Sequence, residues 1–339
     1  MGTSQLATNY IASNYPHHLL SISDLGAGGL VEVFRVAEAF VEVEQRSVPK
    51  VPTLRGKAVA TLFFEESTRT RLSFETAAKR LSADVLSLAV ATSSVKKGES
   101  LRDSVETIEA MGIDALIVRH SSAGAPRQVA RWVKRARVIN AGDGCHEHPT
   151  QAILDCFSVR QVLAERQGVA PISLGAKCFD GMQVLIVGDI RHSRVARSQI
   201  LAYHALGAEI TLAGPASLMP VSTINWPVKI ANDFDEALHK ADVVSLLRPQ
   251  MERGSGSNVP SVREYNAFWG LTLERAKSLR DETIVTHPGP ITRGVEISSQ
   301  VADMPNVIAT RQVSNGIAVR MAVLFLLLGQ GENLGFEKA

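Results

Sequence analysis

A run of hydroxyl and cationic side chains between residues 65 and 71 has the composition of an anion site. It lies between a short apolar run and a helix-like pattern in FFEESTRTRLSFETAAKRL, residues 63 to 81. We expect this segment to open a helix, so that the N–H groups of its first turn point outward without an internal acceptor. Hydroxyls and arginine forks add donors that suit phosphate oxygens. The predicted phosphate ligands are Ser67, Thr68, Arg69 and Thr70, with Arg71 beside them.

Of two other interpretations of this segment, one stays open and the other is not indicated. An ordinary capped helix with arginine salt bridges would have the same composition, so this alternative stays open at the level of the segment alone. A nucleoside triphosphate site is not indicated, because the segment lacks the G-x-x-x-x-G-K pattern of a P-loop.

Two more donors follow further along the chain. His148 stands at the start of the helix-like stretch HPTQAILD, with Gln151 one turn on, and Arg119 lies at the end of the apolar run DALIVRH. Both side chains can donate to a carbonyl oxygen. Each residue also has a purely structural alternative. A lone histidine is more often a loop residue whose hydrogen bonds are made within the loop, and Arg119 could form nothing more than a salt bridge at the end of its strand.

The elements that would position these residues are short aliphatic runs separated by helix-like segments. Continuous apolar runs of this kind are typical of strands buried on both faces, which means parallel sheets covered by helices. Ligands of such sheets bind at the carboxyl ends of the strands, where most of these runs end in polar or glycine-rich clusters. The runs are residues 57–64, 114–120, 183–190, 209–215, 242–248 and 282–290.

The length of 339 residues suits two such α/β lobes. Helix-like segments at 149–168 and 315–330 are expected to cross between them. We predict one domain over 1–149, completed by a C-terminal helix over 312–339, and a second domain over 150–311, with the active site in the cleft between them. The last apolar segment carries Arg320 and is too short for a bilayer span, so we predict a buried helix.

Composition excludes several classes of protein. Lysine and arginine (36) nearly balance aspartate and glutamate (34), so no nucleic-acid or membrane partner is indicated. Three cysteines are an odd number without metal-ligand spacing, and the first twenty residues do not resemble a secretory signal. We therefore expect a cytoplasmic protein.

The segment F-x-E-x-S-T-R-T-R resembles the carbamoyl phosphate signature of the aspartate/ornithine carbamoyltransferase family. The resemblance continues in order over nearly the whole chain, apart from roughly the first 15 and last 10 residues. It is similar above all to the members that use aspartate. The further matching segments are 93–100, 118–120, 148–155, 187–198, 248–253, 287–297 and 314–320.

This resemblance implies roles for the first set of residues. Thr70, Arg119 and His148 would polarise the carbamoyl carbonyl as an oxyanion hole. Gln151 and the HPGP segment, through Gly289 and Pro290, would contact the carbamoyl group. Glycine allows the backbone to come close to a ligand there, and its carbonyls can accept from an NH₂ group.

The segment SSVKKGES, residues 93–100, has no apolar periodicity, which predicts a loop. Adjacent lysines are usually only a solvated charge run. In the family this loop reaches a neighbouring subunit's site, which implies that Ser93 and Lys97 act there and that the protein is a homotrimer with shared active sites.

The second substrate is indicated by charge. Aspartate brings two carboxylates and needs two cations, whereas ornithine would need an acidic or amide partner. Arg194 and Arg248 follow two of the apolar runs, which suits a dicarboxylate. The resemblance assigns them the α- and β-carboxylates, with Gln250 and Lys97 also at the amino acid.

Glu65 and Arg253 match positions that stabilise the closed state in the family. Glu65 has the wrong charge for an anion site, so we expect it to orient a cation through a salt bridge to Arg194 or Arg253. The glycine-rich stretch LGAGGL, residues 25–30, has no preceding strand and receives no functional assignment.

The reaction implied is attack of the aspartate amine on carbamoyl phosphate, giving N-carbamoyl-L-aspartate and phosphate, an early step of pyrimidine biosynthesis. It needs no metal and no organic cofactor. Three rivals are an ornithine-type carbamoyltransferase, a catalytically silent homologue and a nicotinamide-dependent oxidoreductase; the last lacks its glycine fingerprint in VGDIRHSR. Regulatory chains or other pyrimidine enzymes as partners are left open.

Overall fold

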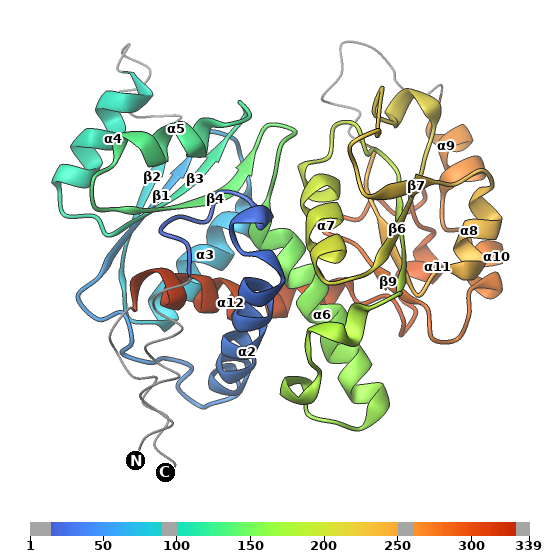
Figure 1. Ribbon diagram of the computed structural model, residues 1–339, viewed down its shortest axis with the longest axis horizontal. Coiled ribbons are helices and arrows are strands. Elements are labelled where there is room, and N and C mark those ends of the chain that lie inside the picture. The colour runs from blue at the N-terminus through green and yellow to red at the C-terminus, as the bar shows by residue number, and fades with distance from the viewer. Residues whose placement is uncertain (1–14, 90–99, 250–260, 330–339) are drawn as a thin grey trace. The chain divides into compact units, whose positions relative to one another are not determined.

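The computed structural model describes residues 15–89, 100–249 and 261–329 (Figure 1). These fall into two compact units. One runs up to Thr150 and takes up the chain again from Gly316, and the other extends from Gln151 to Asn315. Each unit contains one parallel sheet flanked by helices, which confirms the predicted α/β class.

The sheet of the first unit has the order β2-β1-β3-β4, with every pair parallel. Figure 1 shows α4 and α5 on one side of this sheet and α3 on the other. Its strands are β1 (Ala58–Phe63), β2 (Asp84–Ala89), β3 (Ala115–His120) and β4 (Arg137–Asp143). Its helical elements are η1 (Ile22–Asp24), α2 (Gly26–Glu44), α3 (Thr68–Arg80), α4 (Leu101–Ala110) and α5 (Ala125–Trp132).

The sheet of the second unit has the order β7-β6-β5-β8-β9 and is also parallel throughout. Its strands are β5 (Gln183–Val187), β6 (Glu209–Ala213), β7 (Val228–Ile230), β8 (Val243–Leu246) and β9 (Ile284–Thr286). Its α-helices include α7 (Arg194–Ala205), α8 (Phe234–Lys240), α9 (Val262–Trp269), α10 (Leu273–Ser278) and α11 (Ser299–Ala302). Short 3₁₀ turns lie at Pro171–Ser173, Ala176–Phe179 and Ala216–Leu218.

Two helices take part in both units. The first, α6 (Pro149–Gln167), begins at the end of the first unit, and α12 (Ala309–Leu328) leads back to it. In the second half of α12, Phe325 packs edge-on against Phe40, with ring centroids 6.0 Å apart. Arg320 donates to the Ser73 hydroxyl at 2.9 Å and lies over the ring of Phe74. This half of α12 thus packs against α2 and α3.

Among the described residues, α12 is the one helix long and apolar enough to cross a membrane by length and composition. Its apolar side chains from Ala318 to Leu327 are buried in the unit instead. The prediction of a buried helix is therefore confirmed.

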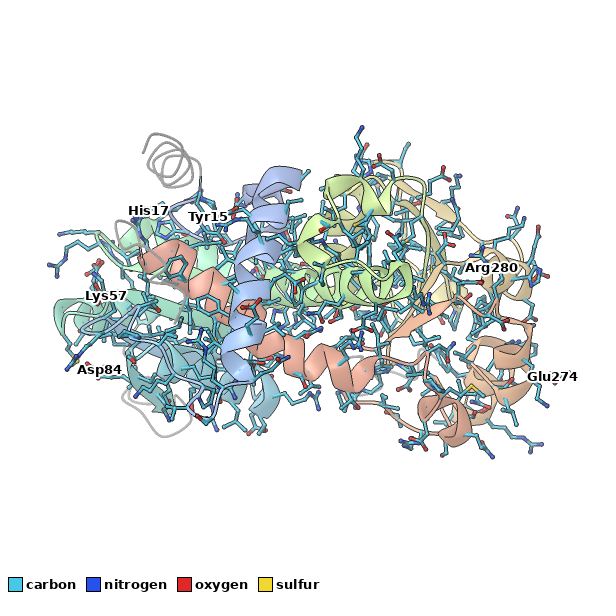
Figure 2. All side chains as sticks on the ribbon, turned by 90° about the horizontal axis from the view of Figure 1, so that it is seen from below. Tyr15, His17, Lys57, Asp84, Glu274 and Arg280 are labelled. Carbon is cyan, nitrogen blue, oxygen red and sulfur yellow. The ribbon has the colours of Figure 1, made fainter. Side chains whose placement is uncertain are left out.

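The strands form because their side chains are apolar and covered. β3 buries five successive residues and β1 buries four, as expected for strands with helices on both faces. In a parallel sheet, all strands have their amino ends at one edge and their carboxyl ends at the other. Lys57 and Asp84, labelled in Figure 2, mark the amino ends of β1 and β2, where the Asp84 N–H donates to the Lys57 carbonyl at 2.8 Å.

All six predicted runs contain a strand, although the last strand ends at Thr286 rather than at residue 290. Among the strands of the described residues, three were not predicted from the sequence: β2, β4 and β7.

Candidate active site

The first unit carries its candidate residues at the carboxyl edge of the sheet. Strand β1 ends at Phe63 and α3 begins at Thr68, as the sequence predicts. Ser67 is the N-cap residue with extended backbone, but its side chain makes no capping hydrogen bond. Its hydroxyl is therefore not consumed by the helix, which weakens the interpretation of this segment as an ordinary capped helix.

The side chains of this first turn differ in burial. Thr70 is buried at 8% exposure, whereas Thr68 and Arg69 are exposed. Arg71 lies on the exposed surface of α3, with its Nε 3.8 Å from a carboxylate oxygen of Glu75. The exposed N–H groups of the turn, the hydroxyls and Arg69 together form a candidate phosphate site.

Arg119 is held next to this turn by two contacts. It is buried at the end of β3, which pairs directly with β1. Its Nη1 donates to the Ala141 carbonyl at 3.1 Å, and its Nη2 donates to Oε1 of Glu65 at 2.7 Å. Two bonds fix the plane of a guanidinium, so Arg119 is oriented before any ligand binds.

The partner of Glu65 found here lies within its own unit. The sequence favours an orienting contact of Glu65 with Arg194 or Arg253, and in the structure Glu65 makes such a contact with Arg119. Pairings of Glu65 with the other two arginines stay predictions.

His148 lies at the end of a tightly bonded turn that follows β4. The carboxylate of Asp143 accepts from the backbone N–H groups of Gly124 and Glu147, at 2.6 and 3.0 Å. Glu147 in turn accepts from the Ser21 hydroxyl at 2.5 Å and the Ile22 N–H at 3.0 Å. These buried carboxylates fix the turn, and His148 follows it at 4% exposure immediately before α6.

In the second unit, Arg194 and Arg248 follow neighbouring strands. Arg194 is the first residue of α7, after β5, and Arg248 follows β8 by two residues. Strands β5 and β8 pair in parallel, so both arginines lie at the carboxyl edge of the same sheet. The backbone segments that follow the two strands approach closely here: a Cβ at Gly188, where φ is +124°, would lie 2.4 Å from the Leu247 carbonyl oxygen.

Gln151 lies on the first turn of α6, where its Nε2 donates to Oδ1 of Asp155 at 2.9 Å. The HPGP segment after β9 is equally fixed. Its Gly289 has φ of +68° and donates its N–H to Nδ1 of His287 at 2.8 Å, and Pro290 follows it. His287 contacts Glu296 through Nε2 at 3.0 Å, and both side chains are fully buried.

Four predicted residues lie outside the described part of the chain: Ser93, Lys97, Gln250 and Arg253. Three further residues were not predicted: Asp155, Gln199 and Gln312. Gln199 and Gln312, like Gln151, donate to Asp155, and Gln312 also accepts from the His287 N–H of the HPGP segment. The signals for Asp155 were its spacing one turn after Gln151 and its place at the end of the matching segment 148–155. Within the described residues, no group of three or more histidine, cysteine and acidic side chains is placed to hold a metal ion.

Both units match models of known protein families. Residues 17–161 match the carbamoyl-P binding domain of aspartate/ornithine carbamoyltransferases, and residues 180–327 match the Asp/Orn binding domain.

Relatives with assigned names agree over nearly the full length. The aspartate carbamoyltransferase catalytic subunit of Thermobifida fusca is 51% identical over 312 residues, covering 92% of this chain and 95% of that protein. The catalytic subunit from Streptomyces coelicolor is 49% identical over 317 residues, covering 93% and 95%.

Solved structures share the fold. Aspartate transcarbamoylase from Trypanosoma cruzi, solved with N-(phosphonacetyl)-L-aspartic acid, superposes with a TM-score of 0.81 at 27% identity, covering 94% of this chain and 97% of that one. The catalytic subunit from M. jannaschii gives 0.78 at 31% identity, covering 94% and 100%. The candidate phosphate site follows β1 in one unit, and the arginine pair follows β5 and β8 in the other, as expected for these two kinds of domain. The matches show that the chain belongs to the aspartate/ornithine carbamoyltransferase family.

Proposed function

We propose that this chain transfers the carbamoyl group of carbamoyl phosphate to the amine of L-aspartate, giving N-carbamoyl-L-aspartate and phosphate. This reaction is an early step of pyrimidine biosynthesis. The observation that carries the choice of amino acid is the pair Arg194 and Arg248 at the ends of adjacent parallel strands, because two cations suit a dicarboxylate. Relatives that are 51% and 49% identical to this chain are named aspartate carbamoyltransferase catalytic subunits, which supports the same choice.

Carbamoyl phosphate would bind to the first turn of α3. Ser67, Thr68 and Arg69 would donate to the phosphate oxygens together with the backbone N–H groups of the turn. Ser93 and Lys97 of a neighbouring subunit would add to this set. All of these groups stabilise the phosphate dianion as it departs.

The carbonyl oxygen of the carbamoyl group would accept from Thr70, Arg119 and His148. Negative charge gathers on this oxygen when the amine attacks the carbon, so donors fixed beforehand stabilise the transition state more than the substrate. The contacts of Arg119 with Glu65 and Ala141 supply this preorganisation.

The incoming aspartate would bind through Arg194 at its α-carboxylate and Arg248 at its β-carboxylate, with Gln250 and Lys97 orienting it. Gln151 and the backbone at Gly289 and Pro290 would accept from NH₂ groups. The neutral amine forms the new C–N bond, the tetrahedral intermediate expels phosphate, and the phosphate takes the amine proton. Positioning and electrostatic stabilisation then account for the rate, without a side-chain base.

The assembly proposed is a homotrimer in the cytoplasm whose active sites are shared between subunits. Glu65 and Arg253 would stabilise the ligand-bound state. Regulatory chains or other enzymes of pyrimidine synthesis are further candidate partners.

The deciding experiment measures ureido-product formation by the purified chain from carbamoyl phosphate with L-aspartate or with L-ornithine. We expect product with aspartate alone. Product with ornithine would overturn the roles of Arg194 and Arg248 while keeping the phosphate site. No product with either amino acid would favour a silent homologue.

A further inference from the structure

Asp155 is a fully buried carboxylate at the centre of a hydrogen-bond network in the second unit. Its Oδ1 accepts from Nε2 of Gln151 at 2.9 Å and from Nε2 of Gln312 at 2.7 Å. Its Oδ2 accepts from Nε2 of Gln199 at 2.7 Å. Three amides from three helices, α6, α7 and α12, therefore converge on one carboxylate.

An ionised carboxylate only accepts hydrogen bonds, so it turns the NH₂ end of each glutamine toward itself and the carbonyl end away. Two of the carbonyl ends have partners that agree with this orientation. Oε1 of Gln199 accepts from the Ser245 hydroxyl at 3.0 Å, and Oε1 of Gln312 accepts from the His287 N–H at 2.9 Å. By the same constraint, Asp155 makes Oε1 of Gln151 the outward end of that amide.

The network continues into the HPGP segment. Gln312 holds the His287 backbone, and Nδ1 of His287 accepts from the Gly289 N–H at 2.8 Å. The same carboxylate thus sets the direction of the Gln151 carbonyl and supports the backbone at residue 289. Both are acceptors for an NH₂ group in the function proposed above.

We propose that Asp155 is a positioning residue that makes the site select the NH₂ group of carbamoyl phosphate. This proposal rests on the proposed function. Acetyl phosphate carries a methyl group in place of that NH₂ and cannot donate to Gln151, so a correctly oriented Oε1 discriminates against it. Without the carboxylate, the Gln151 amide is free to turn its own NH₂ outward, and the discrimination falls.

The test is the ratio of dissociation constants for acetyl phosphate and carbamoyl phosphate in the full-length chain. Asp155→Leu removes the acceptor at similar volume. Since one hydrogen bond to an oriented group is at stake, we expect the ratio to fall about tenfold, with acetyl phosphate affinity changed less than about twofold. Gln151→Met should lower the ratio similarly, and adding Asp155→Leu to it should cause no further fall.

Two variants serve as matched controls. Asp155→Asn should keep the native ratio: its Oδ1 still accepts from Gln151 and Gln312, and Gln199 can turn over because the Ser245 hydroxyl also accepts. Ser245→Ala disturbs the same buried network without touching Gln151 and should keep it too. If Asp155→Leu does not fold, Asp155→Ser replaces it; water at the vacated position both donates and accepts, so the ratio should again fall.

The outcomes separate the two claims. An unchanged ratio in the folded Asp155 variant, or equal losses for both ligands, would overturn the positioning role. A native chain that binds carbamoyl phosphate no more tightly than acetyl phosphate would instead overturn the proposed function.

Discussion

Arg69 and Arg71 are two positions apart on α3, but their surroundings suit different roles. Arg71 lies toward Glu75 along the exposed face of the helix, and Arg69 belongs to the first turn beside Ser67 and Thr68. Sequence composition alone did not separate them, because both are arginines in one hydroxyl-rich segment. Their different surroundings predict that loss of Arg69 and loss of Arg71 affect activity differently.

We expect Arg69→Met to lower kcat/KM for carbamoyl phosphate by roughly 10- to 100-fold, the value of a charge-assisted hydrogen bond to phosphate. Arg71→Met, the matched control on the same turn, should stay within about twofold because exposed pairs contribute little. Steady-state kinetics with saturating aspartate measure both. Equal losses in the two variants would contradict the assignment of Arg69.

His18 and His120 share an arrangement that depends on the neutral imidazole. Nδ1 of His18 accepts from the Val138 N–H at 3.0 Å, and Nδ1 of His120 accepts from the Ser122 N–H at 2.8 Å. Burial lowers the pKa of both, against the opposing effect of Asp24 on His18 and of Glu65 and Asp143 on His120. Protonation at Nδ1 would remove each hydrogen bond.

Because the pKa of both histidines is lower in the folded chain, the unfolded chain binds more protons below its histidine pKa of about 6.5. Their contribution to stability is present above that pH and is lost as pH falls through the folded pKa. The free energy of unfolding by urea should therefore decrease between about pH 7.5 and about pH 5.5.

The double variant His18→Asn, His120→Asn should show a smaller decrease, since Asn Oδ1 accepts in place of Nδ1 without titrating. The exposed His204→Asn should follow the native curve. A double variant with the native pH dependence would show that other groups cause the acid loss.

How much of the site the sequence could predict depends on the kind of contact. The position of Ser67 and Thr68 at the start of a helix follows from local pattern, and the structure confirms it. The pairing of Glu65 with Arg119 joins residues 54 positions apart and depends on β1 and β3 being neighbours. Local sequence carries no signal for that adjacency.

At the level of elements, the glycine-rich start of α2 is open to a stability test. A Cβ on Gly28 would meet nothing within 4 Å, whereas a Cβ on Gly29 would lie 2.9 Å from Cβ of Leu25. Glycine in a helix costs conformational entropy that alanine does not. The two neighbouring positions therefore differ in packing but share their helix propensity.

We expect Gly28→Ala to raise the free energy of unfolding by about 0.5–1 kcal/mol. Gly29→Ala, its control, should gain less or lose stability because Leu25 has to move. Urea or thermal unfolding measures the difference. Destabilisation by Gly28→Ala would indicate that this stretch has a role beyond helix formation.

The strands missed in the sequence have physical explanations. Leu86 and Leu88 of β2 are exposed at the edge of the sheet, so no buried run marks it. Strand β4 ends in Ala141, Gly142 and Asp143, which resemble a loop, although Asn140 and Asp143 are buried and bond each other at 2.9 Å. Strand β7 has three residues, below the length at which periodicity is informative.

At the level of the whole molecule, the proposed shared site is testable by mixing inactive chains. In the proposed arrangement, Lys97→Ala would remove a group that acts in a neighbouring subunit's site, and His148→Ala would remove a group of the chain's own site. Trimers formed from equal amounts of both should regain activity in about one quarter of their sites, because each composite site draws independently on two chains.

Activity is measured after dissociation and reassembly, with native mass spectrometry to verify mixed trimers. Each variant reassembled with itself is the control. Mixed trimers that stay inactive would contradict the sharing of sites between subunits.

The chain leaves the first unit at Thr150 and returns to it at Gly316. During synthesis, the second unit is a continuous segment that can fold as soon as it has emerged from the ribosome. The sheet of the first unit is made earlier, but its helices α2 and α3 receive Phe325 and Arg320 only when α12 emerges. Domains usually fold in the order of synthesis. Here the part made first is completed only after the second unit, and its apolar surface depends on α12 for cover.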